Sequence, residues 1–416
     1  MKRHRIWAGL LGVLVCCVSM MGSIAAREAA AEVTLTFWHT MNEKETPTLL
    51  SIVEEFQQAR PDIKVNVEYV PYGDAQSKFE IAAQTGAAPD IMRSTVIWVC
   101  GFADAGYLLQ LDDYISAEEK ADYLPVAMAY NIYQGKIWGI PQVTDVVALL
   151  YNKRLLKEAG HENPPATLAE MEQVVADVKA KLGIEGFYMR GDAHWFLAFL
   201  WAFGGELFDE QRNIYINNEH SLQALEYFVS QKDKLFPGNT DFANDYNDAM
   251  TLFKEGNVAM ILNGPWATAD ILTGKEFQDA ANLGVAVFPK GPDGHQGSPV
   301  GGQNYVISAD TKYPKEAYEF IHFINQPKYQ VRFAVQNNLL PPRLSVYEDP
   351  EVKSNPIIQG FLAQMKLGRN RPVIPEGAVI YTHLTPNIRA AWRGEKTPKQ
   401  ALDDIAATWK TLLQKE

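Results

Sequence analysis

The feature that most constrains the fold is a strand–helix–strand pattern in residues 33–69. Apolar side chains alternate with polar ones from Val33 to Trp38 and again from Ile63 to Tyr69. Between these segments, one helical face carries Leu49, Ile52, Val53 and Phe56, which is the spacing of an amphipathic helix. Two strands joined through a helix pair in parallel by a right-handed crossover. The pattern therefore predicts an α/β fold.

Later segments carry further helix and strand signals. Two capping boxes, at residues 167–170 and 397–400, predict the starts of two helices. Residues 248–255 predict a helix followed by a strand at 258–262, and residues 314–325 predict another helix. A chain of 416 residues is long enough for two or three domains.

The amino terminus has the layout of a secretory signal. Three basic residues within the first five precede an apolar stretch from Ile6 to about Ile24, and small residues follow. We expect residues 1–26 to be a cleaved signal peptide; a membrane-anchoring helix is the alternative. A lipid anchor on Cys16 or Cys17 is disfavoured, because Val15 stands where lipoprotein signals carry a small residue. Cys100 then remains alone and cannot form an intramolecular disulfide.

The net charge and the absence of known motifs exclude several classes of function. The formal net charge of −12 argues against nucleic acid or an anionic membrane surface as a partner. The sequence contains no HExxH, GxGxxG, GxxxxGK[ST] or GxSxG pattern and no cysteine pair that could hold zinc. We therefore expect no metal, no cofactor and no catalysis. A glycosidase pair of carboxylates stays open, because such pairs have no fixed local spacing.

Aromatic residues stand beside polar ones at the ends of predicted elements. In the turn Asn263-Gly264-Pro265-Trp266 the backbone needs the glycine and proline, but it does not need the indole. Such sites suit sugars, because the apolar face of a pyranose stacks on an aromatic ring and its hydroxyls bond to carboxylates and amides.

Four blocks, in order along the chain, resemble a known family. Residues 253–266 read FKEGNVAMILNGPW, and residues 87–91 read AAPDI. Residues 138–153 contain GIP and then LLYNK, and residues 299–302 read PVGG. Together they resemble the maltose, maltodextrin and trehalose-binding proteins of ABC importers, which belong to extracellular solute-binding protein family 1.

The resemblance implies a two-lobe periplasmic-binding-protein fold of type II, which closes by hinge bending. Lobe one is expected at 32–143 plus 303–326 and lobe two at 147–298 plus 328–416, with crossings near Thr144, Gly301 and Pro327. It also implies the substrate-binding component of a sugar importer, whose partners are a small sugar and membrane-embedded permease subunits. We expect a monomer that is exported to the periplasm or the cell surface.

The resemblance also implies sugar contacts. Trp266 is expected to be a stacking platform, and Asp145 is expected to accept sugar hydroxyls. Asn42 and Glu43 match a polar pair of the family, and Tyr381 matches a family aromatic. The alternatives are a buried core tryptophan for Trp266 and a hinge cap for Asp145.

Three further groups complete the expected site. The first is a loop that supplies a carboxylate and aromatic rings: Asp192, His194 and Trp195. The second follows the block at residues 87–91 and consists of Arg93, Thr95 and Trp98. The third is the glycine pair Gly301 and Gly302, which lets backbone amides approach the sugar or simply forms a turn.

Three other functions stay open. Residues 37–41 resemble the first strand of glycerol-3-phosphate-binding relatives, but a phosphate needs a cluster of cations, and only Arg93 and Arg389 are expected near the cleft. An exported glycoside hydrolase would use two cleft carboxylates, for example Asp145 and Asp192. A surface adhesin would have no pocket.

Overall fold

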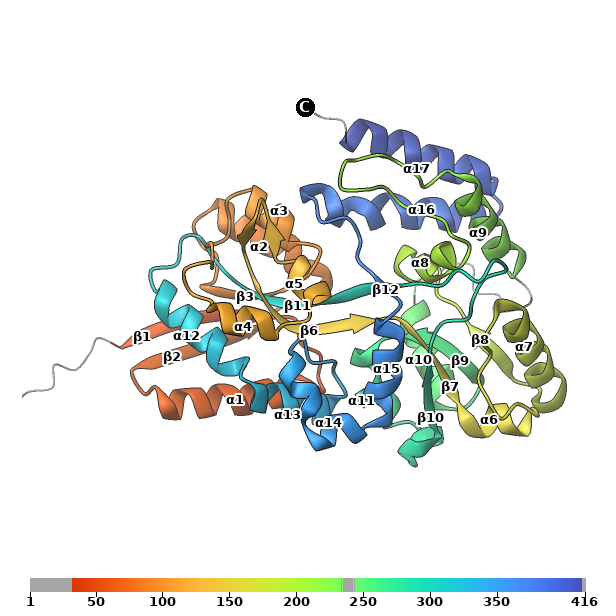
Figure 1. The fold of residues 1–416 in the computed structure, drawn as a ribbon, viewed down its shortest axis with the longest axis horizontal. Helices are drawn as coiled ribbons and strands as arrows, with labels where there is room; N and C mark the ends of the chain where they lie inside the picture. Colours follow the sequence, from red (N-terminus) through yellow and green to blue (C-terminus); the bar gives the residue numbers. More distant parts are fainter. Residues whose placement is uncertain (1–31, 233, 235–241, 243, 414–416) are drawn as a thin grey trace, which may run out of the picture.

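The computed structural model describes residues 32–232, 234, 242 and 244–413 (Figure 1). The signal peptide expected at residues 1–26 lies outside the described residues. Within the described part of the chain, no helix is both long and apolar enough to cross a membrane.

A six-stranded sheet organises the first part of the molecule. Its strands follow the order β12-β11-β3-β1-β2, and β6 pairs with β11. The three amino-terminal strands are parallel, as the strand–helix–strand pattern predicts, whereas β11 runs antiparallel to β3 and β6. The strands are β1 (Val33–His39), β2 (Ile63–Tyr69), β3 (Ile91–Thr95), β6 (Ile140–Val146), β11 (Ser298–Ile307) and β12 (Gly368–Arg369).

Helices cover both faces of this sheet, and we call the sheet with its helices the first lobe. Figure 1 shows α2 and α3 above the sheet and α1 below it. The helices are α1 (Thr46–Ala59), α2 (Tyr72–Gln84), α3 (Val99–Asp104), α4 (Ala117–Asp122), α5 (Pro125–Ala129), α12 (Pro314–Ile324) and α13 (Pro327–Asn337). A small antiparallel pair, β4 (Ile132–Tyr133) and β5 (Lys136–Ile137), lies beside them.

A four-stranded sheet organises the second lobe, in the order β10-β7-β9-β8. Its strands are β7 (Ala148–Asn152), β8 (Glu185–Tyr188), β9 (Val258–Asn263) and β10 (Leu283–Ala286). The helices of the remaining chain are α6 (Lys153–Glu158), α7 (Leu168–Leu182), α8 (Ala193–Ala202), α9 (Glu219–Ser230), α10 (Asp245–Lys254), α11 (Thr268–Ile271), α14 (Pro350–Ser354), α15 (Pro356–Met365), α16 (Ile380–Trp392) and α17 (Pro398–Leu413).

Local sequence explains where several of these elements begin. Thr167 caps α7 by accepting a hydrogen bond from the Glu170 amide at 3.1 Å. Before α17, the Gln400 amide donates to Thr397 Oγ1 at 3.2 Å while the Thr397 amide donates back to Gln400 Oε1 at 3.0 Å. Both helix starts predicted from the sequence are confirmed. The box at α17 closes in both directions, whereas at α7 the Glu170 carboxylate accepts from the Ala166 amide at 2.8 Å instead of the Thr167 amide. Each cap satisfies amides that a helix start leaves without partners.

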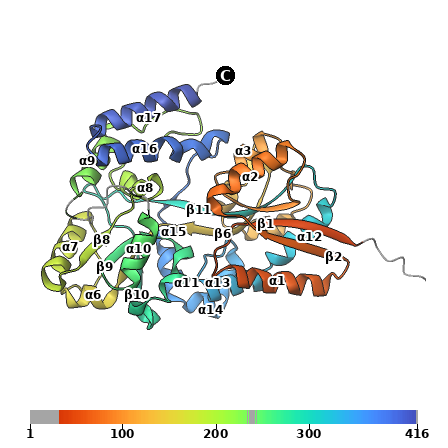
Figure 2. The ribbon, with the colours of Figure 1, turned by 180° about the vertical axis from the view of Figure 1, so that it is seen from behind.

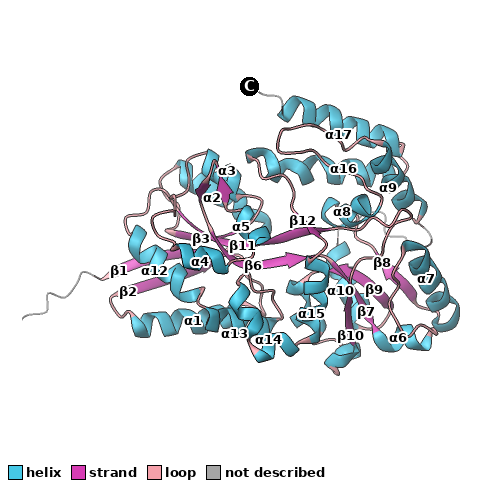
Figure 3. Cartoon of the chain, viewed as in Figure 1, coloured by secondary structure: helices cyan, strands magenta, loops and turns pink. Residues whose placement is uncertain are grey.

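The two lobes meet where strands pass from one to the other. The chain leaves β6 of the first sheet and enters β7 of the second sheet through the single residue Val147. β11 lies along the same join in both views (Figures 1 and 2), and Figure 1 shows β12 next to it. Each sheet has its own apolar core, and a third cluster that includes Val146, Val300 and Leu340 packs at the join. In Figure 3 the strands at the join are flanked by helices of both lobes.

Candidate functional site

Side chains from both lobes and from the join line one cavity of about 700 Å³, a size that suits a drug-sized ligand. The first lobe supplies Thr40, Asn42, Glu45, Tyr72, Arg93, Thr95 and Ile97. The second supplies Arg190, Asp192, His194, Trp195, Tyr246, Pro265, Trp266, Tyr381 and Thr385. The join supplies Val143, Asp145, Gly301, Gly302, Gln303, Leu339 and Arg371.

Trp266 follows the end of β9, in a single 3₁₀ turn at Pro265–Ala267. The indole folds back over the turn and lies against Gly264. A Cβ atom added to that glycine would lie only 2.0 Å from the six-membered ring. The glycine of this turn therefore makes room for the indole. Trp266 is half-buried and packs against the cores of both lobes and against the cluster at the join. It is held at the join with part of its surface open to the cavity.

Two aromatic side chains of the second lobe, His194 and Trp195, lie against Trp266, and Tyr381 packs on His194. The rings of His194 and Trp195 each lie with centroids 6.4 Å from the indole, and Tyr381 Oη lies 3.2 Å from His194 Nδ1. Trp195 Nε1 donates to the Leu262 carbonyl at 2.9 Å, which fixes that ring against β9. Burial, reinforced by nearby guanidinium groups, holds the pKa of His194 well below its usual value. The imidazole is therefore neutral at pH 7.

Asp192 and Arg190 hold the start of α8. The Asp192 carboxylate caps the helix by accepting from the His194 amide at 3.0 Å. Its other oxygen lies 3.0 Å from Arg190, whose guanidinium also pairs with Asp245 and stacks over the Trp195 ring at 3.9 Å. The charges of Asp192 and Arg190 are therefore already paired with other groups of the protein.

Asp145 lies on β6 at the join, opposite Gly301 of β11. A Cβ atom at Gly301 would lie 2.1 Å from Asp145 Oδ1, so the carboxylate occupies the space that the glycine leaves. No lysine or arginine among the described residues comes within 4.0 Å of this carboxylate. Burial raises the pKa of Asp145 to about 7, although the charges of Arg371 and Arg93 oppose the rise. A Cβ atom at Gly302, whose φ is +141°, would lie 2.3 Å from the Val143 carbonyl oxygen.

Arg371 connects the two lobes at the join. It follows β12, and its side chain is buried at 4% exposure. Its guanidinium donates to the Val300 carbonyl of β11 at 2.8 Å, to Tyr130 Oη of the first lobe at 3.3 Å, and to Tyr381 Oη of the second lobe. Its positive charge is solvated by neutral oxygens and has Asp145 as a more distant counter-charge.

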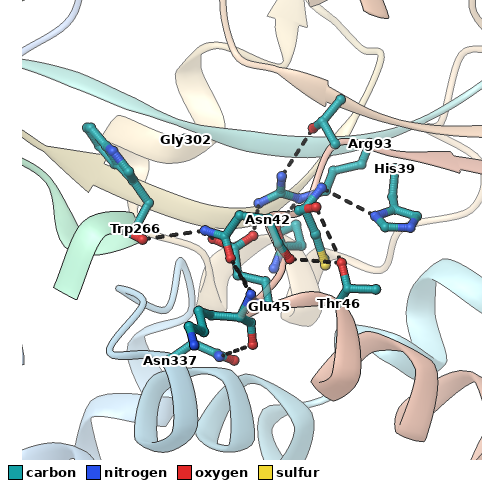
Figure 4. A network of polar contacts seen from close by, with 12 residues as sticks. His39, Asn42, Glu45, Thr46, Arg93, Trp266, Gly302 and Asn337 are labelled. Atoms are coloured by element: carbon teal, nitrogen blue, oxygen red, sulfur yellow. Dashed lines mark hydrogen bonds and ion pairs between the residues drawn. The ribbon is translucent and has the colours of Figure 1, made fainter. Parts of the chain in front are cut away.

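The loop after β1 brings polar groups to the first-lobe side (Figure 4). Asn42 Oδ1 accepts from the Lys44 and Glu45 amides at 2.9 and 3.0 Å, which folds the loop into a turn. Asn42 Nδ2 donates to Glu45 Oε1 and, across the cavity, to the Trp266 carbonyl at 3.4 Å. The buried Glu45 carboxylate lies 3.5 Å from Arg93, and burial raises its pKa.

Arg93 and Thr95 extend from β3 toward the cavity. Arg93 donates to Gln142 Oε1 at 2.9 Å and to Thr40 Oγ1 at 3.2 Å in addition to its ion pair with Glu45. Thr95 Oγ1 lies 3.3 Å from the Gly302 carbonyl. Every polar group of Arg93 is therefore fixed by the protein before any ligand arrives.

Eleven of the residues expected from the sequence line this cavity, and two do not. The eleven are Asn42, Arg93, Thr95, Asp145, Asp192, His194, Trp195, Trp266, Gly301, Gly302 and Tyr381. Glu43 is exposed outside the lining, because the Asn42 turn points Glu45 inward instead. Trp98 is buried behind Tyr72, with the two rings stacked at 5.4 Å. Trp201, further along α8, is buried in the core of the second lobe.

The sequence analysis missed several lining residues and predicted too few arginines in the lining of the cavity. Arg190 and Arg371 line the cavity, whereas Arg389 does not and donates to the Gly191 carbonyl. Tyr72 and Tyr246 also line it. A polar or aromatic residue two or three positions after the end of a strand was the usable signal for Tyr72 and Arg190, which follow β2 and β8. Arg371 had no such signal, since β12 is only two residues long.

The described residues contain no group of three or more His, Cys, Asp or Glu side chains that could hold a metal ion. Cys100 is buried, and burial raises the pKa of its thiol to about 12.

A two-lobe α/β molecule with a cavity at its join matches a known family. The model of the bacterial extracellular solute-binding proteins matches residues 51–360. The chain belongs to this family. As expected from the sequence, the solute-binding protein has the two-lobe periplasmic-binding-protein fold of type II.

Relatives with solved structures or known ligands agree with this assignment. The GacH receptor of Streptomyces glaucescens, solved unliganded and with acarbose, is 36% identical, with a TM-score of 0.87 over 92% of this chain and 99% of the receptor. Maltose-bound MalE3 of T. maritima is 26% identical, with a TM-score of 0.82 over 91% of this chain and all of that protein. The maltotriose-binding protein of Pyrococcus abyssi is 27% identical over 338 residues, 79% of this chain and 70% of that relative.

Proposed function

We propose that this solute-binding protein is the substrate-binding component of an ABC sugar importer. It binds an α-glucoside such as maltose, a maltodextrin or trehalose in the cavity between the lobes. The observation that carries the proposal is the half-buried indole of Trp266 at the join, in the same cavity lining as Asp145 and Arg371. The ligands of MalE3 and of the Pyrococcus abyssi relative support the same class of sugar.

The cavity supplies both kinds of contact that a pyranose needs. The apolar face of a ring stacks on Trp266, which offers a large rigid surface at small entropic loss. Asp145 and Arg371 are coupled electrostatically but lie beyond ion-pair distance. A sugar hydroxyl between them donates to the carboxylate and accepts from the guanidinium, and such charge-assisted bonds are the stronger kind.

The hinge strands support capture by closure. The lobes divide at 32–143 plus 303–326 and at 147–298 plus 328–416, with α13 of the last range packed on the first lobe. Solute binding bends the segments that join them. The hydrogen bond from Asn42 to the Trp266 carbonyl, which spans the cavity, favours the closed arrangement. The closed form then docks through both lobes on membrane-embedded permease subunits. The protein acts as a monomer outside the cytoplasmic membrane, in the periplasm or at the cell surface.

Binding of a phosphorylated solute such as glycerol-3-phosphate is the weaker reading, despite three arginines in the lining. Arg93 is neutralised by Glu45, and Arg190 by Asp192 and Asp245. Three of the five N–H groups of Arg371 donate to Val300, Tyr130 and Tyr381, so it is the single arginine of the lining with donors left for a ligand and no carboxylate partner. The cavity therefore lacks the cluster of free cations that a phosphate dianion needs.

Hydrolysis of a glycoside also fits less well than binding. A glycosidase needs two carboxylates, one as the acid and one as nucleophile or base. Of the carboxylates that line the cavity, Glu45 and Asp192 are paired with arginines and hold local turns. Asp145 is left as a single available group, so the lining supports capture of an intact sugar.

A ligand screen tests the proposal. Thermal shift measurements with maltose, maltotriose, trehalose, glucose and glycerol-3-phosphate should show stabilisation by α-glucosides alone, and calorimetry should give the affinities. Incubation with maltotriose should leave it intact. Stabilisation by glycerol-3-phosphate alone, or release of shorter sugars, would contradict the proposal.

A further inference from the structure

A short 3₁₀ turn, η5 (Pro375–Val379), reaches from the second lobe to the first. The residues on either side of it, Ile374 and Ile380, are buried in the core of the second lobe, at 7% and 1% exposure. The turn itself packs against α3 of the first lobe. In both ribbon views α16, which follows η5, begins beside α3 (Figures 1 and 2). The turn is therefore anchored in one lobe and touches the other.

The contact between η5 and α3 is close. A Cβ atom added to Gly101 of α3 would lie 3.1 Å from the Pro375 carbonyl oxygen, so the glycine leaves room for the backbone of the turn. Ala378 packs against the first-lobe cluster that contains Val99 and Phe102. Contacts of this kind have a short range and weaken steeply when a gap opens. This one can therefore form only while the two lobes are close together.

Glu376 holds the turn from the side of the second lobe. Arg212 Nη2 donates to both oxygens of the Glu376 carboxylate, at 3.0 and 3.1 Å. Arg212 has a φ of +66°, a left-handed conformation that is uncommon for a residue other than glycine. Such strain persists where the surrounding structure holds the residue in place. The pair fixes the orientation in which η5 meets α3.

The contact lies beside the cavity but outside its lining. Arg371 and Tyr381, which line the cavity, come before and after η5 along the chain, whereas the residues of η5 and α3 are absent from the lining. The bond from Asn42 to the Trp266 carbonyl crosses the cavity at another place. Trp266 precedes α11, which both views place on the opposite side of the molecule from α3 (Figures 1 and 2). The lobes thus touch on two sides of the cavity.

We propose that η5 is a latch, a second-lobe segment that docks on α3 of the first lobe, holds the lobes closed and so sets the affinity for sugar without touching the sugar. A sugar that contacts both lobes binds the closed form better, and its apparent affinity scales with the fraction of molecules that are closed. This inference rests on the proposed function and deepens it, because it assigns the regulation of the sugar site to a contact outside the cavity.

Gly101→Leu tests the latch from the first lobe, because its side chain needs the space of the Pro375 carbonyl and must displace η5. In calorimetry on the full chain, maltose, maltotriose and trehalose should each bind about tenfold more weakly if the closed fraction falls tenfold, with the ratios between sugars unchanged. Small-angle X-ray scattering of the sugar-free variant should give a larger radius of gyration. Gly73→Leu is the matched control, since Gly73 lies in first-lobe helix α2 with nothing within 4 Å of its Cβ position.

Ala378→Asp tests the same contact from the second lobe, because it places a charge against the apolar first-lobe cluster. It should reproduce the losses of Gly101→Leu. If both variants break one contact, the double variant should lose little more affinity than either alone.

Cys100 of α3 gives a readout that needs no sugar. Its thiol is 3% exposed, and the charge of Glu376 contributes to its raised pKa, so the turn lies near it. Gly101→Leu and Ala378→Asp should speed its reaction with a maleimide, and Gly73→Leu should not.

Several results would overturn the latch. Unequal losses among the sugars would place the substituted residues in the sugar site, and additive losses in the double variant would show two separate effects. A wild-type radius of gyration and thiol reactivity in both variants would also refute it. If Gly101→Leu does not fold by circular dichroism, Ala378→Asp still decides, because Ala378 is half-buried in a short turn. A wild-type protein that binds no α-glucoside overturns the proposed function, whereas the scattering and thiol measurements still decide on the latch.

Discussion

The sharpest prediction concerns the pH dependence of sugar binding through Asp145. Its pKa is raised to about 7 in the sugar-free protein because the carboxylate is buried. A sugar hydroxyl donates most strongly to the ionised form, so binding should favour loss of the proton. Affinity should therefore be highest above pH 7 and should fall as the pH drops below it.

The size of the effect follows from the pKa. If only the ionised form binds, each pH unit below about 7 weakens affinity up to tenfold, which limits the loss between pH 8 and pH 5 to about a hundredfold. Several charged or titratable groups face Asp145: Arg371, Arg93, Glu45 and Tyr72. The arginines stay charged throughout this range. The comparison with Asp145→Asn separates Asp145 from the others.

Calorimetry in buffers of different ionisation enthalpy measures the effect directly. At pH 6 the wild type should release up to about one proton per sugar bound, and at pH 8.5 almost none. Asp145→Asn should bind weakly, with little change between pH 5 and pH 8 and without proton release. A flat profile in the wild type, or the same slope in Asp145→Asn, would refute the assigned role of this carboxylate.

The Asp145 carboxyl group also makes the free energy of unfolding depend on pH, and the direction of that dependence follows from its pKa. Its folded pKa of about 7 lies above its ordinary value of 3.8, so between about pH 4 and pH 7 the folded protein holds a proton that the unfolded chain has lost. The free energy of unfolding contributed by Asp145 therefore falls as the pH rises through that window. Denaturant titrations of the sugar-free protein should show this slope, and Asp145→Asn should remove it.

Three further substitutions test other parts of the structure. Trp266→Ala should weaken sugar binding by about 1–3 kcal/mol through lost stacking and burial, and unchanged affinity in calorimetry would exclude the indole from the site. Gly301→Ala should weaken binding with the fold retained, because its Cβ displaces the Asp145 carboxylate; the pH profile should then resemble that of Asp145→Asn. Thr397→Ala breaks the box with Gln400 and should lower the free energy of unfolding by about 1 kcal/mol, measured by urea denaturation, without changing sugar affinity.

Features that depend on neighbours in the sequence could be predicted. The capping box of Thr397 and Gln400 forms in both directions because its partners are three residues apart. Trp266 could be singled out because its turn already has the residues that a turn needs. Strand alternation from Val33 onward correctly gave a parallel start of the sheet.

Features that depend on partners distant in the sequence could not be predicted from it. Arg371 follows a two-residue strand and draws its meaning from Tyr130, Val300 and Tyr381, which lie in three separate segments. In the loop after β1, composition alone did not tell Glu43 from Glu45; the hydrogen bonds of one turn decided which carboxylate faces inward. That the lining residues bind sugar remains a prediction.

The long strand β11 has a consequence for how the molecule is made. It pairs with β3 through Gln303 and Thr95, and with β6 and β12 as well. A polypeptide that emerges amino terminus first thus presents β1, β2 and β3 long before the strand that completes their sheet has been delivered. Throughout that interval the nascent molecule has an open β3 edge and no finished first core. The second lobe waits for residues that come later still, because Ile388, Trp392 and Trp409 of α16 and α17 belong to its core. Neither half should therefore survive as an independent fragment if the chain is cut ahead of Ser298.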